Sequence, residues 1–182
     1  MPKYIITGGP GAGKTSLLNA LEEKGFSVSE EASRQLIIEE VAKGSECLPW
    51  INLPAFAEKA LERMQSLYHA APKGQATFFD RGIPDIIAYL KAASIDPDAK
   101  YYQALFKCQY HPQVFILPPW EGIYVNDTER WQTFEEASQL YQSIKETYEE
   151  LGFELIELPS ASIKERAELV VSHIENFVSA TR

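Results

Sequence analysis

The sequence predicts an α/β fold in which a parallel sheet lies between two layers of helices. Short apolar runs typical of strands alternate with longer segments of helical periodicity, which is the pattern of stacked βαβ units. A glycine-rich turn follows the first strand-like run and leads directly into a helical segment. With 182 residues and a hydrophobic content of 45%, the chain has enough apolar material for a sizeable core. We therefore expect residues 1–182 to form a single domain.

Five strand-like runs define the predicted sheet. Each is short, contains β-branched or aromatic residues, and ends close to glycine, proline or an acidic residue. The runs are Lys3–Thr7, Phe26–Ser29, Ala76–Asp80, Gln113–Leu117 and Phe153–Leu158.

Helical segments follow each of these strands. In the second segment, Leu36, Ile37 and Val41 are expected to be buried. Capping boxes, in which Ser or Thr precedes Glu by three residues, begin the last two helices. The predicted helices are Lys14–Lys24, Glu31–Lys43, Pro54–His69, Pro84–Ala93, Ala99–Tyr110 and those that begin at Thr133–Glu136 and Ser162–Glu165.

The glycine-rich turn matches the phosphate-binding pattern G-x-x-x-x-G-K-[ST] at every position. Glycines let the backbone turn tightly, so that successive N–H groups face a phosphate, and the following helix adds its positive dipole end. The lysine can then bridge the β- and γ-phosphates, and the threonine hydroxyl can bind Mg²⁺. The predicted ATP-binding residues are Gly8, Gly9, Pro10, Gly11, Ala12, Gly13, Lys14, Thr15 and Ser16.

An acidic residue and an arginine end the third strand. Asp80 is expected beside the first strand, where its carboxylate, with the hydroxyl of Thr15, would hold Mg²⁺. The alternative for Asp80 is a cap on the next helix. Arg81 would project into the adjoining cleft and bind a hydroxyl, phosphate or carboxylate of the substrate. Its alternative is a structural ion pair.

A second acid–arginine pair follows the second strand. Glu31 and Arg34 are three residues apart and share one face of a helix, at the rim where ligands of open α/β sheets bind. Glu31 is expected to act as the base that accepts a proton from the attacking hydroxyl, and Arg34 to bind substrate. Glu30 is the competing choice for the base, and a solvated acid in the first helical turn is the structural alternative.

The polar stretch after the fourth strand, residues 118–132, is expected to act as a lid over the triphosphate. Arg130 would then neutralise charge that develops on the transferred phosphoryl group. An exposed loop arginine is the alternative. Aromatic side chains that flank the supposed cleft and could stack on a ring are Trp50, Trp120, Tyr124 and Trp131.

These residues together resemble the P-loop kinases among the AAA-type ATPase domains of the NadR kind. That group is similar to nicotinamide riboside kinases and, more distantly, to deoxynucleoside and thymidylate kinases. The matching pieces are GGPGAGKT, EEASR, FFDRGIPD and NDTERW. The resemblance implies a three-layer P-loop NTPase fold with a five-stranded sheet of order 2-3-1-4-5, and ATP as phosphate donor. It also implies that Asp80 and Arg81 form the family's DR pair.

Composition limits the partners and the compartment. A formal net charge of −9 disfavours nucleic acid and anionic membranes as main partners. No apolar run approaches the ~18 residues that cross a bilayer, so we expect a cytoplasmic protein. Cys47 and Cys108 belong to no Cys/His cluster, so a zinc site is not expected, and reduced thiols are favoured over a disulfide. The sequence is also compatible with a homodimer.

The function expected from this set is that of a small-molecule kinase with ATP and Mg²⁺ as cofactors. Its acceptor would be a nucleoside, nucleotide or similar metabolite. One alternative is an ATPase or GTPase switch that acts on a protein partner, although the chain has no N-K-x-D motif for reading guanine. Another is a non-catalytic nucleotide-binding module.

Overall fold

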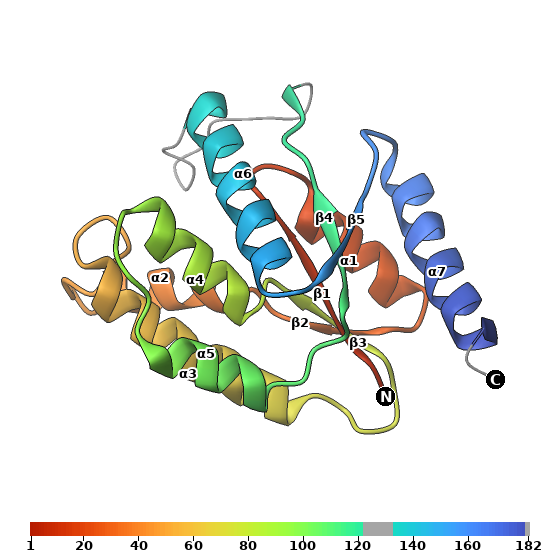
Figure 1. Cartoon of the computed structure of the whole chain (residues 1–182), viewed down its shortest axis with the longest axis horizontal. Helices are drawn as coiled ribbons and strands as arrows, with labels where there is room; N and C mark the ends of the chain where they lie inside the picture. The colour runs from red at the N-terminus through yellow and green to blue at the C-terminus, as the bar shows by residue number, and fades with distance from the viewer. Residues whose placement is uncertain (122–132, 181–182) are drawn as a thin grey trace.

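The computed structural model describes residues 1–121 and 133–180, in which a five-stranded parallel sheet lies between two layers of helices (Figure 1). The strand order is β2-β3-β1-β4-β5, and every neighbouring pair is parallel. This order confirms the prediction. The strands are β1 (Lys3–Gly8), β2 (Ser27–Ser29), β3 (Thr77–Asp80), β4 (Gln113–Leu117) and β5 (Glu154–Glu157).

Helices cover both faces of the sheet, as Figure 1 shows. Two of them pack together on one face, α1 (Lys14–Glu23) and α7 (Ile163–Ala180). The other layer contains α2 (Ala32–Ala42), α3 (Leu53–Ala70), α4 (Ile83–Ala92), α5 (Ala99–Lys107) and α6 (Phe134–Glu150).

Successive side chains of β1 serve two separate cores, because neighbouring residues of a strand point to opposite faces of the sheet. Ile5 packs in the core formed with α2 to α6. Tyr4 and Ile6 pack in the core formed with α1 and α7. Both faces of the central strand are therefore buried, which holds the turn that follows it on a rigid base.

The predicted capping boxes are confirmed where two helices begin. At α6, the Thr133 N–H donates to Glu136 Oε2 over 2.7 Å, and the Glu136 N–H donates to Thr133 Oγ1 over 3.2 Å. At α7, the Ser162 N–H donates to Glu165 Oε2 over 2.9 Å. These bonds satisfy backbone donors that would otherwise lack partners in the first helical turn.

One predicted helix ends earlier than expected. The sequence pattern predicts a single helix over Ala99–Tyr110, but α5 ends at Lys107. The chain then turns toward β4 so that the ring of Tyr110 packs edge-on against Tyr68 and Phe79, at centroid distances of 5.1 and 5.6 Å. Tertiary packing thus overrides the local helical pattern.

The predicted core face of α2 is partly wrong. Leu36 is buried and Ile37 is half-buried, but Val41 is 55% exposed. Its neighbour Glu40 is buried instead, and its two carboxylate oxygens accept bonds from Lys43 at 3.0 Å and Lys59 at 2.8 Å. These bonds lower the pKa of Glu40 to about 2, with the bond from Lys59 contributing most.

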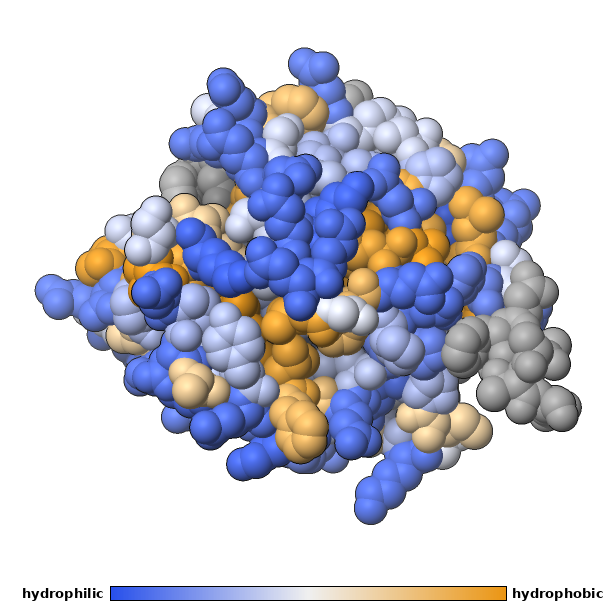
Figure 2. Space-filling model, viewed as in Figure 1, coloured by the Kyte–Doolittle hydropathy of each residue, from blue (hydrophilic) through white to orange (hydrophobic). Residues whose placement is uncertain are grey.

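Mainly hydrophilic side chains cover the face of the molecule that Figure 2 shows. Within the described residues, no helix combines the length and the apolar character that crossing a bilayer requires. Cys47 and Cys108 are free thiols, as predicted.

Candidate functional site

The glycine-rich turn connects β1 to α1 and needs glycine at particular positions. Gly8 lies so close to β4 that a side chain there would overlap the carbonyl oxygen of Leu117. Gly11 and Gly13 have φ angles of 75° and 86°, a left-handed conformation that glycine adopts without steric cost. Gly13 is also the N-cap of α1, so the loop ends at the positive end of that helix.

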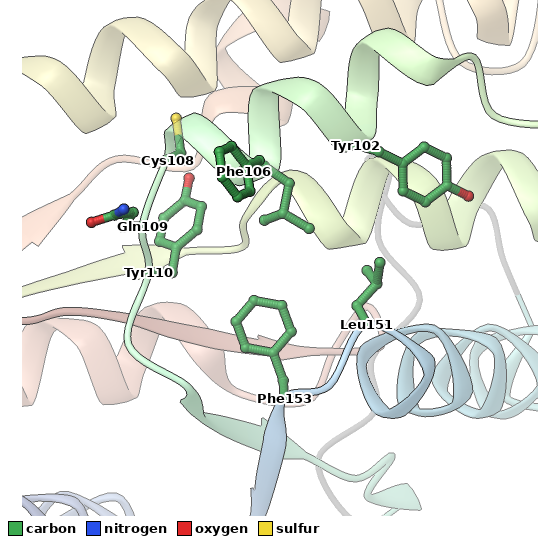
Figure 3. A pocket seen from close by; sticks show the side chains of 8 residues that line it. Tyr102, Phe106, Cys108, Gln109, Tyr110, Leu151 and Phe153 are labelled. Atoms are coloured by element: carbon green, nitrogen blue, oxygen red, sulfur yellow. The ribbon is translucent and has the colours of Figure 1, made fainter.

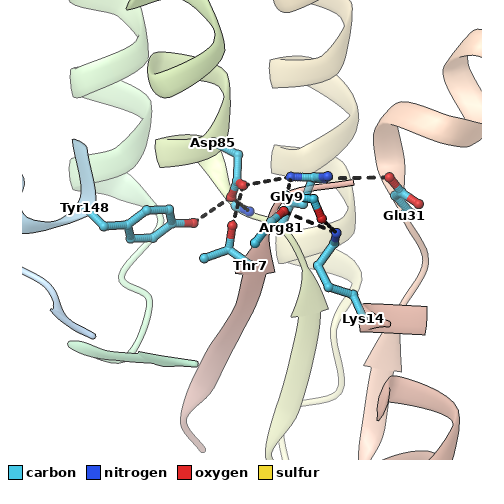
Figure 4. Close-up of polar contacts among 9 residues, drawn as sticks. Thr7, Gly9, Lys14, Glu31, Arg81, Asp85 and Tyr148 are labelled. Carbon is cyan, nitrogen blue, oxygen red and sulfur yellow. Dashed lines mark hydrogen bonds and ion pairs between the residues drawn. The ribbon is translucent and has the colours of Figure 1, made fainter. Parts of the chain in front are cut away.

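Lys14 is buried and lies across the loop. Its ammonium group donates to the carbonyl oxygens of Gly8 at 3.3 Å and Gly9 at 3.0 Å (Figure 4). Burial, and then the neighbouring Arg81, lower the pKa of Lys14 to about 8, although nearby carboxylates act in the opposite direction. The lysine therefore lies in a polar cluster at the carboxyl ends of the strands.

Oxygen ligands suitable for Mg²⁺ lie beside the loop. Asp80 ends β3 and is 5% exposed, and its Oδ1 is buried without a hydrogen-bond partner. Thr15 and Ser16 are exposed in the first turn of α1. Among the described residues, no three acidic, histidine or cysteine side chains could hold a metal by themselves. Mg²⁺ is usually held by one or two protein ligands together with substrate phosphates, so Asp80 and Thr15 fit this ion.

Asp80 does not cap the next helix, which was the alternative prediction. The N-cap of α4 is Gly82, whose N–H donates to Asp85 Oδ2 over 2.9 Å. Asp80 is left in the charged cluster, where burial first, and then Glu31 and Asp85, raise the pKa of its carboxyl to about 6 against the effect of Lys14 and Arg81. A bound cation would favour the ionised form of this carboxyl.

Arg81 is folded into the site. It is 7% exposed, and its Nη1 lies 3.2 Å from both the carbonyl oxygen of Gly8 and Asp85 Oδ1. Its Nε lies 3.6 Å from Glu31 Oε1. Its backbone has a φ of 70°, an uncommon conformation for a residue with a side chain. The guanidinium is thus held by the protein itself, and the substrate contact predicted for Arg81 stays a prediction.

Asp85 joins this network, and we did not single it out from the sequence. Its carboxylate accepts bonds from Thr7 Oγ1 at 2.5 Å and from Tyr148 Oη at 2.6 Å, besides those from Gly82 and Arg81 (Figure 4). It is 2% exposed. Asp85 therefore ties β1, the end of β3 and α6 together beneath the loop. The sequence signal that could have found it is an acid three residues after Gly82, which is the position of a capping carboxylate.

The acid and the arginine predicted at the start of α2 differ in their distance from the loop cluster. Glu31 is the N-cap of α2, and its carboxylate, 26% exposed, reaches Arg81. Arg34 is exposed in the first turns of the same helix. Glu30, the competing base, is exposed. The structure thus brings Lys14, Glu31, Asp80 and Arg81 together, whereas Arg34 lies at the outer rim.

Part of the predicted site lies outside the described residues, including Arg130, Tyr124, Trp131 and most of the lid-like segment 118–132. Of the other aromatic candidates, Trp50 is 49% exposed and Trp120 is half-buried. Their stacking role stays a prediction.

A groove of about 420 Å³ lies at the other end of the sheet, where α5 leads toward β4 and α6 leads into β5 (Figure 3). It is lined by Tyr102, Leu105, Phe106, Cys108, Gln109, Tyr110, Leu151 and Phe153. These residues precede the strands, whereas the phosphate-binding loop follows one. The described residues that line the groove include no carboxylate, lysine or arginine.

Comparison with known proteins identifies the same kind of fold. A family model described as an AAA domain matches residues 3–166. No curated protein matches the chain.

Solved structures match 96% of the chain at low identity. A deoxyadenosine kinase from M. mycoides, with dCMP and a flexible dCDP bound, has 16% identity and a TM-score of 0.69 over 99% of its length. NadR protein in complex with NR has 14% identity and a TM-score of 0.72, and this chain spans 50% of it. A thymidylate kinase from Ehrlichia chaffeensis has 16% identity and a TM-score of 0.64 over 100% of its length. These structural similarities establish a P-loop NTPase fold. Because the sequence identities are only 14–16%, they establish nothing beyond the fold.

Proposed function

The chain belongs to the AAA-domain family, and from this membership and the geometry of the loop we propose that it is a small-molecule kinase. It would transfer the γ-phosphoryl group of ATP to a nucleoside, a nucleotide or a similar metabolite. The observation that carries the proposal is the meeting of Lys14 and Arg81 at the Gly8 carbonyl, with Glu31 beside them. A phosphate-binding loop and a carboxylate that would receive an acceptor hydroxyl would therefore share one site. Solved structures similar to the chain include a deoxyadenosine kinase and a thymidylate kinase, which supports the same class.

The donor would lie along residues 8–16. The backbone N–H groups of the loop and the Lys14 ammonium would bind the β- and γ-phosphates, as their placement at the start of α1 suggests. Thr15 and Asp80 would hold Mg²⁺, which supplies positive charge to the phosphate oxygens when it is bound. The unpartnered Oδ1 of Asp80 is the observation that supports this role.

The acceptor would enter from the side of α2. Glu31, partly exposed and next to Arg81, would orient the acceptor hydroxyl and take its proton. Arg34 would bind a more distant polar group of the acceptor from the rim. Arg81 would act on the acceptor with the guanidinium edge that Gly8, Asp85 and Glu31 leave available.

The reaction would be an in-line displacement at phosphorus. The acceptor oxygen forms a bond to the γ-phosphorus while the bond from that phosphorus to the β,γ-bridging oxygen breaks. The electron pair of the broken bond leaves with ADP, and the proton of the acceptor passes to Glu31. The protein contributes mainly positioning and electrostatic stabilisation. Arg130, in the lid-like segment 118–132 of this single domain, would neutralise charge on the transferring group.

A nucleotide hydrolase that acts on a protein partner is the second candidate. The internal pairing of Arg81 with Asp85 and Glu31 favours it, because a guanidinium already engaged by the protein binds a substrate less readily. In that case Glu31 would orient a water molecule in place of an acceptor hydroxyl.

A screen with γ-labelled ATP distinguishes the two functions. The purified protein, with Mg²⁺, is incubated with nucleosides, nucleotides and phosphorylated metabolites, and labelled products are separated. Label in one organic product establishes the kinase, and label only in inorganic phosphate refutes it in favour of the hydrolase. Lys14→Ala is the control, since either activity of this site must disappear with the lysine.

A further inference from the structure

A second buried arginine contacts the phosphate-binding loop, at Ala12, whereas Arg81 contacts it at Gly8. Arg166 belongs to the first turn of α7 and has an exposed fraction of 0%. Its Nη1 donates to the carbonyl oxygen of Ala12 over 3.1 Å, and its Nε donates to the carbonyl oxygen of Pro159 over 2.9 Å. The guanidinium also lies 5.0 Å from the centre of the Trp120 ring. One side chain thus joins the loop, the segment before α7 and the segment after β4.

Burying the Arg166 guanidinium carries a desolvation penalty for the folded protein. Among the described residues no carboxylate pairs with Arg166, and its Nη2 is buried without a hydrogen-bond partner. Removing a cation from water carries a penalty, which a nearby carboxylate usually reduces. A cation in the first turn of a helix also faces the positive end of the helix dipole.

The contact with Ala12 fixes the orientation of one peptide group in the loop. In a trans peptide the C=O of one residue and the N–H of the next point in opposite directions. By holding the carbonyl of Ala12 on its own side, Arg166 directs the N–H of Gly13 to the opposite side. Gly13, with a φ of 86°, has the backbone freedom to take other orientations, so an external contact is needed to select one.

The same relation holds at the start of the loop. Arg81 and Lys14 hold the carbonyl of Gly8, and they thereby direct the N–H of Gly9 away from themselves. The positive charge of Arg81 is offset by Asp85 and Glu31. The charge of Arg166 has no such offset in the described chain, so it adds a positive potential next to residues that face a phosphate chain.

We propose that Arg166 is a positioning residue for the phosphate donor. It holds the Ala12–Gly13 peptide with its N–H toward the triphosphate, and it supplies behind the loop a positive charge that no carboxylate of the described residues pairs with. The identity of the anion, a nucleoside triphosphate, rests on the proposed function, whereas the positioning role does not require an acceptor.

Binding of Mg-ATP and of Mg-tripolyphosphate, measured by titration calorimetry, tests this role. Arg166→Lys keeps the charge, but one ammonium cannot reproduce a planar fork to two carbonyls, so we expect Kd for both ligands to rise about tenfold. Arg166→Met should raise both further. The matched control is Arg63→Lys, an arginine of α3 paired with Glu39 at 2.7 Å and remote from the loop, which should leave both values within about twofold. A Kd that is unchanged in Arg166→Lys, or raised for ATP but not for tripolyphosphate, overturns the proposal.

Two further measurements separate positioning from general stability. In Arg166→Ala, added guanidinium should restore tripolyphosphate affinity at concentrations that do not raise the melting temperature. In the wild-type protein, saturating Mg-tripolyphosphate should shift the NMR signal of the Arg166 Nε–H. If the signal does not shift, the positioning role is wrong, and this measurement can be made even if every variant misfolds. None of these readouts needs an acceptor, so failure to find phosphotransfer would refute the kinase without deciding the role of Arg166.

Discussion

Arg81 and Arg166 both hold a carbonyl of the phosphate-binding loop, but their surroundings differ in one respect. Arg81, at the Gly8 end, is flanked by Asp85 and Glu31. Arg166, at the Ala12 end, has carbonyl oxygens and an indole ring as its neighbours among the described residues. The side chains of Arg81 and Arg166 are 7% and 0% exposed, so both are withdrawn from solvent, and they differ in whether acids lie beside them.

The titration behaviour of the two arginines reflects this difference. Burial alone would lower the pKa of Arg81, but Tyr89 and the surrounding carboxylates outweigh it and raise the pKa. Burial lowers the pKa of Arg166 without that compensation. The Arg81 end is therefore a nearly neutral network that organises the site. At the Arg166 end, no acid among the described residues offsets the positive charge, which a bound phosphate chain would offset.

The largest expected effect is on stability at the Arg81 end. Arg81→Met should lower the free energy of unfolding by about 3–5 kcal/mol, because it leaves buried Asp85 without its cation. Arg166→Met should cost only about 1–2 kcal/mol, since it removes hydrogen bonds but strands no charge. Urea unfolding at pH 7 measures both, with Arg63→Met as a surface control expected below about 1 kcal/mol. Equal losses for the two buried arginines would contradict the comparison.

A second prediction separates catalysis from donor binding. Glu31→Gln should reduce phosphotransfer to the acceptor by about 10²–10⁴-fold, because it removes the proposed base. Its affinity for Mg-ATP should stay within about twofold, which is the opposite of the pattern expected for Arg166→Lys. Steady-state kinetics and calorimetry give the two quantities. If Glu31→Gln keeps full phosphotransfer, Glu31 is not the base.

The pH dependence of stability should arise at the Arg81 end. Because the pKa of Asp80 is raised from 3.8 to about 6 in the folded state, the folded protein holds this proton more tightly than the unfolded chain. The resulting stabilisation is complete below pH ~4 and is lost as the pH rises through ~6.

Comparison of the wild-type protein with Asp80→Asn isolates this contribution. The stability of the wild type relative to the variant should fall by roughly 2–3 kcal/mol between pH 4 and 7. Arg166→Met should keep the pH dependence of the wild type. A constant difference between wild type and Asp80→Asn across this range would show that the carboxyl is not perturbed.

The smallest effect is expected at the outer edge of the Asp85 network. Tyr148→Phe removes the 2.6 Å bond from Oη to Asp85 Oδ2 and should cost about 1–2 kcal/mol, since a buried carboxylate loses a donor. Tyr141→Phe is the matched control on the same helix, because its bond to Glu157 is exposed and should contribute about 0.5 kcal/mol or less. Thermal unfolding of the two variants gives the difference, and equal losses would mean that Asp85 does not depend on Tyr148.

The positions of the acidic residues at the Arg81 end could largely be predicted from local sequence. Asp80 ends a strand, and Glu31 begins the helix after another, and the carboxyl ends of parallel strands meet at one edge of a sheet. Their proximity to Lys14 follows from that rule. The bond from Tyr148 to Asp85 spans 63 positions and has no local signal, because no pattern in α6 indicates which residue of α4 it faces.

The phosphate-binding pattern, the alternation of strands and helices and the capping boxes can be recognised in the amino-acid sequence, since each depends on residues close together in the chain. What surrounds the loop depends on how distant parts of the chain pack together. Arg166 lies 154 positions from Ala12, and as part of an amphipathic helix it gives no indication of the carbonyl that it contacts. Helical periodicity determines which face of α7 is buried, but the partner on that face depends on how α7 packs against α1 and the sheet.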